Sequence, residues 1–204
     1  MKVKYSDLKN KRVFITGGGS GIGASIVEHF CEQGSEVYFV DINIKETNRL
    51  LKKIKKNKFR MPNFIECNLL DINKLEKIIK KIISTKGPIH ALVNSAANDD
   101  RHTTDQVDEK YWENRMAINL KHYFFAAKAV VKAMKKIKSG SIVNLSSVSW
   151  MLGEGDKVVY ETAKSAVVGL TRSVAQEYGK YNIRTNSVVP GSIATERQIK
   201  HWLT

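Results

Sequence analysis

Tyr160 and Lys164 are the residues whose types and spacing offer chemistry most directly. They lie four positions apart in the string YETAK, within a predicted helix at 158–178, so both side chains project from one face. A tyrosine with a pKa of about 10 is a poor base at neutral pH, but a nearby ammonium group favours the phenolate and lowers that pKa. Ser147, thirteen residues before Tyr160, adds a hydroxyl at the end of a predicted strand. The three groups together could hold an oxygen and move its proton, although a Tyr-x-x-x-Lys pair by itself is usually an exposed helix pair.

A glycine-rich string, TGGGSGIG at 16–23, lies between the first predicted strand and the helix that follows it. Glycines permit a tight turn there and let backbone N–H groups approach a pyrophosphate at the helix N-terminus. The strict G-x-G-x-x-G pattern fails from Gly17 because Ile22 takes its last glycine position, whereas a looser register from Gly19 to Ala24 fits. Such a turn can be purely structural, but its place between strand and helix predicts a dinucleotide site.

Asp41 ends the second predicted strand, eighteen residues beyond the last glycine of that string. A carboxylate at this place accepts hydrogen bonds from the adenosine ribose and repels a 2′-phosphate. Neither Ile42 nor Asn43 offers a cation that would attract such a phosphate. The pattern therefore favours NAD over NADP, with a helix cap as the alternative role for Asp41.

The elements that must position these residues follow from the hydrophobic pattern. Short apolar runs rich in β-branched residues alternate with amphipathic segments, which is typical of a parallel sheet covered by helices on both faces. Without a linker, repeat or low-complexity tract, the chain is predicted to be a single α/β domain over 1–204, with a doubly wound Rossmann-type parallel sheet. We expect strands at 12–16, 36–41, 64–67, 89–94, 141–145 and 184–189, and the clearest helices at 24–33, 75–83, 108–136 and 158–178.

Composition excludes several classes of protein and leaves one open. The chain has 204 residues, 42% of them hydrophobic, which suffices for one buried core. It has no apolar run long enough to span a bilayer, and residues 1–10 are polar and charged, without the apolar core of a signal peptide. Cys31 and Cys67 show no metal or redox spacing, which suits a reducing cytoplasm and predicts no metal site. The net charge of +14 leaves nucleic-acid binding open, but the excess is spread along the chain, so we expect a solvated lysine-rich surface.

These motifs, taken in order, resemble those of the short-chain dehydrogenase/reductase family. The resemblance extends to an altered N-N-A-G motif at Asn94-Ser-Ala-Ala97, to Asn119 in the long predicted helix, and to Pro190-Gly191 followed by Thr195. It implies that Ser147 holds the substrate oxygen, that Tyr160 is the general base, and that Lys164 binds the nicotinamide ribose and lowers the pKa of the tyrosine. It implies that Asn119 anchors a water that relays protons, and that Thr195 and Ile193 hold the carboxamide.

The resemblance also implies where the cofactor, NAD, is bound. Two departures from the family pattern fall on this region: Asn68 replaces the usual aspartate facing adenine, and Ser95 and Ala97 replace the usual Asn and Gly. An amide can still bond the base, so we expect cofactor binding to survive. The implied contacts are Gly17, Ser20, Gly21, Ile22, Gly23, Asp41, Asn68, Leu69, Asn94, Ala96, Tyr160, Lys164, Pro190, Gly191, Ile193 and Thr195.

The substrate is indicated by the residues that follow the fourth and fifth predicted strands. Asn98 and Asp99 offer acceptors for hydroxyl groups, and Ser149 and Trp150 add a hydroxyl and an aromatic face, a combination that suits a sugar. A surface turn with a local ion pair is the alternative reading of the acidic loop. The strings NDDRH at 98–102 and SW at 149–150 resemble bacterial NAD-dependent dehydrogenases that act on D-xylose, which implies oxidation of an aldose at C1 to the lactone.

Length adds a further expectation. Members of the family run to about 250 residues, so we expect the chain to lack the last helix and strand of the sheet, leaving the sixth strand at an open edge. We expect such a chain to be poorly stable or inactive alone, and its full-length form to be a cytoplasmic homodimer or homotetramer without membrane contact. Two alternatives to a sugar dehydrogenase remain: a dehydrogenase of another alcohol or ketone, and a basic nucleic-acid-binding or NAD-sensing protein without catalysis.

Overall fold

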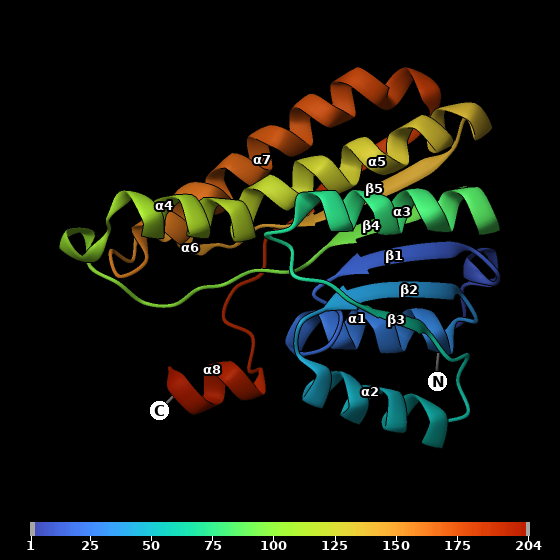
Figure 1. The fold of residues 1–204 in the computed structure, drawn as a ribbon, viewed down its shortest axis with the longest axis horizontal. Helices are drawn as coiled ribbons and strands as arrows, with labels where there is room; N and C mark the ends of the chain where they lie inside the picture. The colour runs from blue at the N-terminus through green and yellow to red at the C-terminus, as the bar shows by residue number, and fades with distance from the viewer. Residues whose placement is uncertain (1–2, 203–204) are drawn as a thin grey trace.

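Six parallel strands form one sheet in the part of the chain that this computed structural model describes, residues 3–202 (Figure 1). The strand order is β3-β2-β1-β4-β5-β6, so the chain reverses its direction of progression across the sheet between β1 and β4. This order confirms the predicted doubly wound Rossmann-type fold, in which ligands bind beyond the carboxyl ends of the strands at the reversal. The strands are β1 (Arg12–Thr16), β2 (Glu36–Asp41), β3 (Asn63–Glu66), β4 (Ala91–Asn94), β5 (Gly140–Leu145) and β6 (Ile183–Val188).

Hydrophobic side chains cover both faces of the sheet, and each face packs against its own helices. Along β1, Phe14 joins one buried cluster while its neighbours Val13 and Ile15 join the other, as expected for a strand that is covered on both sides. Helices α3, α5 and α7 lie on one face and α1 and α2 on the other (Figure 1). Their bounds are α1 (Gly21–Glu32), α2 (Ile44–Lys56), α3 (Ile72–Lys86), α4 (Glu109–Met116), α5 (His122–Ile137), α6 (Ser149–Leu152), α7 (Val158–Tyr178) and α8 (Glu196–His201).

The prediction of a single helix at 108–136 is wrong in one respect, because a π-helical turn interrupts the helix. Helix α4 ends at Met116, the π turn covers Ala117–Lys121, and α5 begins at His122. A π turn adds one residue to the helical repeat and often marks a functional site. The apolar spacing on either side stays helical, so the sequence pattern does not reveal the insertion.

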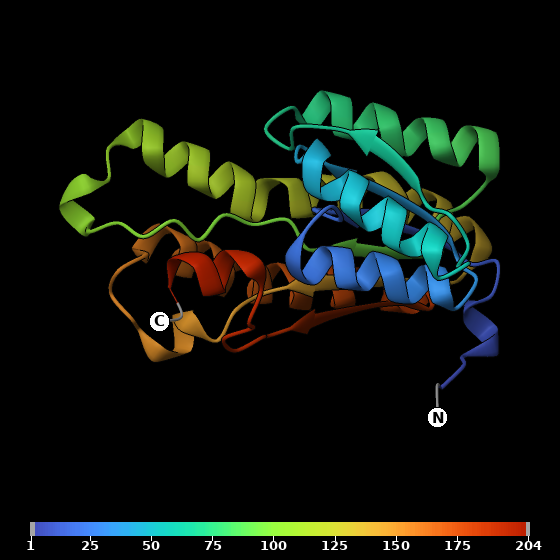
Figure 2. The same ribbon diagram turned by 90° about the horizontal axis from the view of Figure 1, so that it is seen from below.

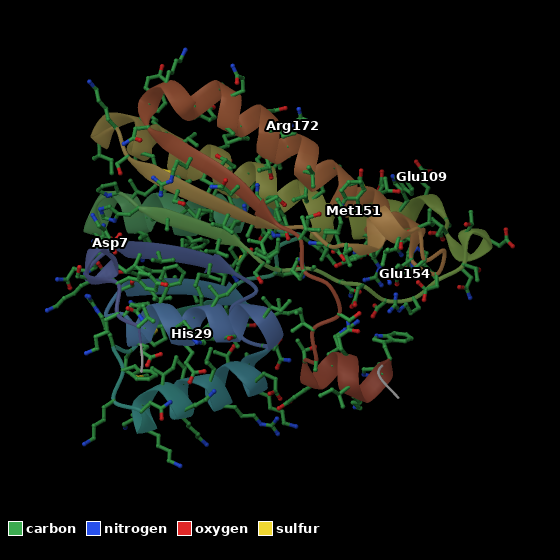
Figure 3. The ribbon with its side chains drawn as sticks, turned by 180° about the vertical axis from the view of Figure 1, so that it is seen from behind. Asp7, His29, Glu109, Met151, Glu154 and Arg172 are labelled. Atoms are coloured by element: carbon green, nitrogen blue, oxygen red, sulfur yellow. The ribbon has the colours of Figure 1, made fainter. Side chains whose placement is uncertain are left out.

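The carboxyl ends of the strands are covered by α4, α6 and α8, which gather at one end of the molecule (Figures 1 and 2). Figure 3 shows Met151, Glu154 and Glu109 at this end and Asp7 at the other. Short helix α8 follows the last strand and reaches across to the loop after β4, where Arg197 contacts Asp99 at 3.2 Å. The chain therefore closes over the region where the sequence places its chemistry.

Strand β6 lies at one edge of the sheet within the described residues. Val188 at its end is half-exposed, as are Val189 and Ile193 in the segment that follows. The expectation that the chain lacks the last helix and strand of the sheet concerns the end of the chain. That end includes residues 203 and 204, which lie outside the described residues. Within residues 3–202, no helix is both long and apolar enough to cross a membrane.

Candidate active site

The glycine turn connects β1 to α1 and has a conformation that side chains would prevent. Gly17 has a φ of +69°, and a Cβ atom there would lie 2.6 Å from Cα of Ala96. The turn is fixed from the sheet side because the Gly17 amide donates to the Val40 carbonyl at 2.8 Å. The close approach brings the turn against the loop after β4, so two predicted cofactor segments meet here.

The N-terminus of α1 has free backbone donors where a phosphate would bind. Ser20 is the N-cap, yet its side chain makes no capping hydrogen bond, whereas Asn43, Asp71 and Asp108 cap α2, α3 and α4 with their side chains. The first amides of a helix need an acceptor, and the helix dipole favours an anionic one. The chain therefore fits the pyrophosphate of a dinucleotide at this turn.

Asp41 lies beside the same turn at the end of β2. One carboxylate oxygen accepts from the Gly19 amide at 2.7 Å and the other from the Asn43 amide at 2.8 Å. A Cβ atom on Gly19 would lie 2.9 Å from that first oxygen, so the glycine permits the contact. The charge is thus held in place next to the turn, while the capping role for α2 belongs to Asn43.

The remaining predicted cofactor residues lie around this edge of the sheet, with different roles for their side chains. Asn68 is exposed after β3, and its oxygen accepts from the Leu70 amide at 3.0 Å. The Asn94 side chain points into the core, where it donates to Asn144 at 2.9 Å, so only its backbone is left to face a ligand. Leu69 is buried after β3, Ile22 and Gly23 lie in α1, Pro190 and Gly191 follow β6, and Ile193 is half-exposed before α8.

Thr195 and Gly21 lie in two predicted cofactor segments that are far apart in the sequence and close together in the structure. Thr195 caps α8 by accepting from the Gln198 amide at 3.2 Å. Its methyl carbon lies 3.4 Å from the position of a Cβ atom on Gly21, at the N-terminus of α1. The start of α8 therefore faces the glycine turn.

Tyr160 and Ser147 meet at the carboxyl end of β5, as the sequence predicts for the reacting centre. Burial raises the pKa of Tyr160 to about 12, and a hydrogen bond with Ser147 acts in the opposite direction. The Ser147 hydroxyl also contacts that of Ser149 at 2.9 Å and accepts from the Ser149 amide at 3.2 Å. The Ser147 hydroxyl therefore contacts the side chains of both Tyr160 and Ser149.

Lys164 lies on the same face of α7, one turn after Tyr160, and is 1% exposed. Its ammonium nitrogen lies 5.5 Å from the centre of the Tyr160 ring. It donates to the Leu145 carbonyl at 2.7 Å and to the Tyr123 hydroxyl at 2.9 Å. Burial lowers the pKa of Lys164 to about 7, while the Asp99 charge raises it. Leu145 and Tyr123 therefore accept from two of its three N–H donors, and one donor is left.

Asn119 lies in the π turn and fixes the loop after β4. Its side-chain oxygen accepts from the Asn98 amide at 2.8 Å and its amide donates to the Asn98 carbonyl at 3.0 Å. Asn119 is fully buried, so this paired contact holds the backbone of Asn98 in one orientation. The side chain positions the loop on which the predicted substrate residues lie.

The predicted substrate residues Asn98, Asp99, Ser149 and Trp150 lie at this same edge of the sheet. The carboxylate of Asp99 contacts Arg197 at 3.2 Å and the Gln198 side chain at 2.6 Å, both on α8. The Asn98 oxygen accepts from the Asp100 amide at 2.9 Å. The acidic side chains of the loop therefore pair with Arg197 on α8 and Arg115 on α4, and not with Arg101 inside the loop as in a simple surface turn.

Two residues of this region carry roles that the sequence did not show. His102 accepts from the Val159 amide at 3.3 Å and contacts the Tyr111 hydroxyl at 2.9 Å, so it holds the start of α7, one residue before Tyr160. Tyr123 reaches Lys164 from α5. Within residues 3–202, no three His, Cys, Asp or Glu side chains are arranged to hold a metal ion.

Comparison with known proteins agrees with this geometry. A family model described as short chain dehydrogenase matches residues 11–203. The D-xylose 1-dehydrogenase of Caulobacter vibrioides is 42% identical over 200 residues, which are 98% of this chain and 78% of that protein. A protein of Rhizobium meliloti named "Probable galactose dehydrogenase GalD" is 40% identical over 201 residues, with the same two shares.

A solved structure with a similar fold is the ligand-free aldohexose dehydrogenase of Thermoplasma acidophilum. It is 31% identical, with a TM-score of 0.84, over 96% of this chain and 72% of that one. The residues that the family model matches include the glycine turn, the strand ends and the helix with Tyr160 and Lys164. The chain therefore belongs to the short-chain dehydrogenase family, and it is an oxidoreductase that uses a nicotinamide cofactor.

Proposed function

We propose that the chain oxidises an aldose at C1 to the lactone with NAD, and that Tyr160 is the general base. The observation that carries the proposal is the meeting of Tyr160, Ser147 and buried Lys164 beside the glycine turn. When bound, the nicotinamide ring supplies the acceptor for the hydride that leaves C1. Side chains of this protein bind the substrate oxygen and remove its proton.

Each side chain in the proposed reaction has one task. Ser147 binds the anomeric oxygen and holds it near the phenol of Tyr160. Ionised Tyr160 takes the proton of the anomeric hydroxyl as the C1–H bond breaks and the C1–O bond becomes a carbonyl. The charge of Lys164 stabilises the phenolate, and its remaining N–H donor would be available to the nicotinamide ribose of a bound cofactor. Asn119 holds the loop backbone at Asn98 against this centre.

The sugar assignment is supported by the polar groups that surround this centre. Asp99, Gln198 and Arg197 offer acceptors and donors in one place, and Trp150 adds an aromatic side chain beside Ser149. The names of the two curated relatives, which refer to D-xylose and galactose, support the same class of substrate. A change of one or two hydroxyl contacts is enough to alter the choice among aldoses.

The experiment that tests this assignment is a screen for NAD reduction. Purified protein is assayed with a panel of pentoses and hexoses, and with acyclic and cyclic secondary alcohols. Each assay is repeated with NADP. We expect reduction of NAD with at least one aldose and formation of the lactone, detected with hydroxylamine. Turnover of the other alcohols without turnover of any aldose would overturn the sugar assignment and leave a dehydrogenase of another class.

The Asp41→Asn variant tests the preference for NAD. We expect the KM for NAD to rise about tenfold, because a hydrogen bond to a charged group is worth about 1.5–3 kcal/mol. We expect the ratio of kcat/KM for NAD to that for NADP to fall at least tenfold, because the charge that repels a 2′-phosphate is removed. Steady-state kinetics with both cofactors measure the two effects.

The matched control for this variant is Asp71→Asn, which makes the same change at the cap of α3. Asp71 accepts from the Lys74 amide at 2.8 Å, away from the glycine turn. Its cofactor ratio should equal that of the wild type. An unchanged ratio in Asp41→Asn would contradict the role of this carboxylate.

The proposal extends to the cellular compartment and the oligomeric state of the protein. Both cysteines of the chain, Cys31 and Cys67, are buried free thiols, which supports a reducing cytoplasm. Members of the family are commonly oligomeric, and we extend the proposal to a homodimer or homotetramer. Light scattering of the protein in solution checks the oligomeric state.

A further inference from the structure

The ammonium group of Lys164 is held from behind by two oxygen atoms. The Leu145 carbonyl at the end of β5 lies 2.7 Å away, and the Tyr123 hydroxyl at the start of α5 lies 2.9 Å away. Tyr123 is fully buried, and so is nearly all of Lys164. A buried ammonium needs acceptors for its donors, so these two contacts decide both where the group lies and how well its charge is tolerated.

The phenol of Tyr123 is oriented as an acceptor toward Lys164. Its oxygen also lies 3.0 Å from the Leu145 carbonyl and 3.3 Å from the Ala96 carbonyl. Both carbonyls are acceptors only, so the single phenol proton goes to one of them and the lone pairs remain for the lysine. Burial raises the pKa of Tyr123 well above its ordinary value, and this group stays neutral.

From this geometry we infer that Tyr123 is a positioning residue for Lys164, and that it keeps the lysine protonated so that Tyr160 can be the group that loses a proton. The inference rests on the proposed role of Tyr160 as general base, and it is independent of which alcohol is oxidised. Tyr123 lies on α5, and its hydrogen bonds in the described part of the chain go to Ala96, Leu145 and Lys164 and not to Tyr160. The inference therefore assigns it a role that acts through Lys164.

The reason is that either Tyr160 or Lys164 can be the group that loses the first proton from the pair. The loss can come from Tyr160, which gives a phenolate beside an ammonium, or from Lys164, which gives a phenol beside a neutral amine. Only the first arrangement contains a base. Burial favours the second, because it raises the pKa of Tyr160 and lowers that of Lys164. An acceptor for the ammonium shifts the balance back toward the active form.

The other ionisable groups around Lys164 act in different directions. Asp99, on the loop after β4, raises the pKa of the lysine. His122, next to Tyr123 on α5, is fully buried, and burial lowers its pKa to about 3, so it is neutral at working pH. Within residues 3–202, Tyr123 is thus the neutral side chain that contacts the ammonium directly.

The Tyr123→Phe variant tests the inference through the pH dependence of the rate. Loss of one acceptor makes the lysine more acidic, and we expect about one pH unit, a tenfold effect. On the plateau of the kcat/KM profile the rate should fall about tenfold, since more of the enzyme is in the inactive form. The midpoint of the acid limb should move to lower pH by up to about one unit, because the pair loses its proton earlier. Well below the midpoint the two rates should agree.

A purely structural role would give a different profile. Damage to the site lowers the rate by one factor at every pH and leaves the midpoint in place. A uniform loss, or an unchanged rate and midpoint, would therefore overturn the inference. Tyr38→Phe is the matched control, because this buried phenol of β2 donates to Glu36 at 2.7 Å and lies outside the site. Its profile should match that of the wild type.

A second substitution keeps the test decisive if Tyr123→Phe does not fold. Incorporation of 3-fluorotyrosine at position 123 keeps the ring and the hydroxyl but makes the oxygen a weaker acceptor. We expect a smaller shift in the same direction, and no shift would overturn the inference. All profiles are measured with whichever alcohol the wild type oxidises best, so failure of the sugar assignment and failure of this inference are separate results.

Discussion

The Tyr160→Phe variant is expected to lose at least a thousandfold in kcat while its Kd for NAD stays within twofold of the wild-type value. Proton transfer by a positioned group contributes about 10²–10⁴-fold to a rate, and the phenol of Tyr160 is the group that contacts Ser147 at the proposed reacting centre. Phenylalanine keeps the ring and its packing in α7, so only the proton-transferring oxygen is removed. Stopped assays of NAD reduction and fluorescence titration of NAD measure the two quantities.

The control for this result is Tyr178→Phe, which makes the same change at the other end of the same helix. Tyr178 closes α7 and packs near Lys135, whose nitrogen lies 6.0 Å from its ring centre. This variant should keep full turnover. A Tyr160→Phe enzyme that retains a tenth of the wild-type rate would show that another group accepts the proton, and the mechanism proposed above would be wrong.

The Gly23→Ala variant is expected to weaken NAD binding at least a hundredfold. A Cβ atom on Gly23 would lie 1.9 Å from the Gly17 carbonyl oxygen and 2.8 Å from its carbon, distances that no contact between these atoms permits. Gly17 cannot retreat, because its own backbone lies against Ala96 and donates to Val40. The turn must therefore open, and the amides at the start of α1 lose the arrangement that fits a pyrophosphate.

Unfolding measurements complete this prediction. Overpacking of this kind costs about 1–3 kcal/mol, so the free energy of unfolding should fall by that amount in Gly23→Ala. Gly169→Ala is the matched control, since Gly169 lies in α7 with nothing within 4 Å of its Cβ position. That variant should bind NAD normally and gain about 0.5–1 kcal/mol of stability from helix propensity. Equal NAD affinity in both variants would contradict the role of the turn.

Local patterns in the sequence determined much of the fold. The six predicted runs became the six strands, with ends that differ by at most two residues. The central strands are largely apolar because a parallel strand inside the sheet is covered on both faces. The edge strands β3 and β6 are more polar and carry exposed residues. The glycine string determined the turn after β1, since Gly17 has a backbone conformation that other residues rarely adopt. The relation of Tyr160 to Lys164 was also predictable, because four residues bring side chains to one face of a helix.

The rest was decided by contacts between residues far apart in the chain. The sequence predicted that Lys164 would lie near Tyr160, but which atoms hold its ammonium depends on where β5 and α5 pack against α7, and Tyr123 shows no sign of that role in the sequence. The π turn at Asn119 and the pairing of Asp99 with α8 depend likewise on the loop after β4. Periodicity records which face of an element is buried, and only the order of strands in the sheet decides which partners that face meets.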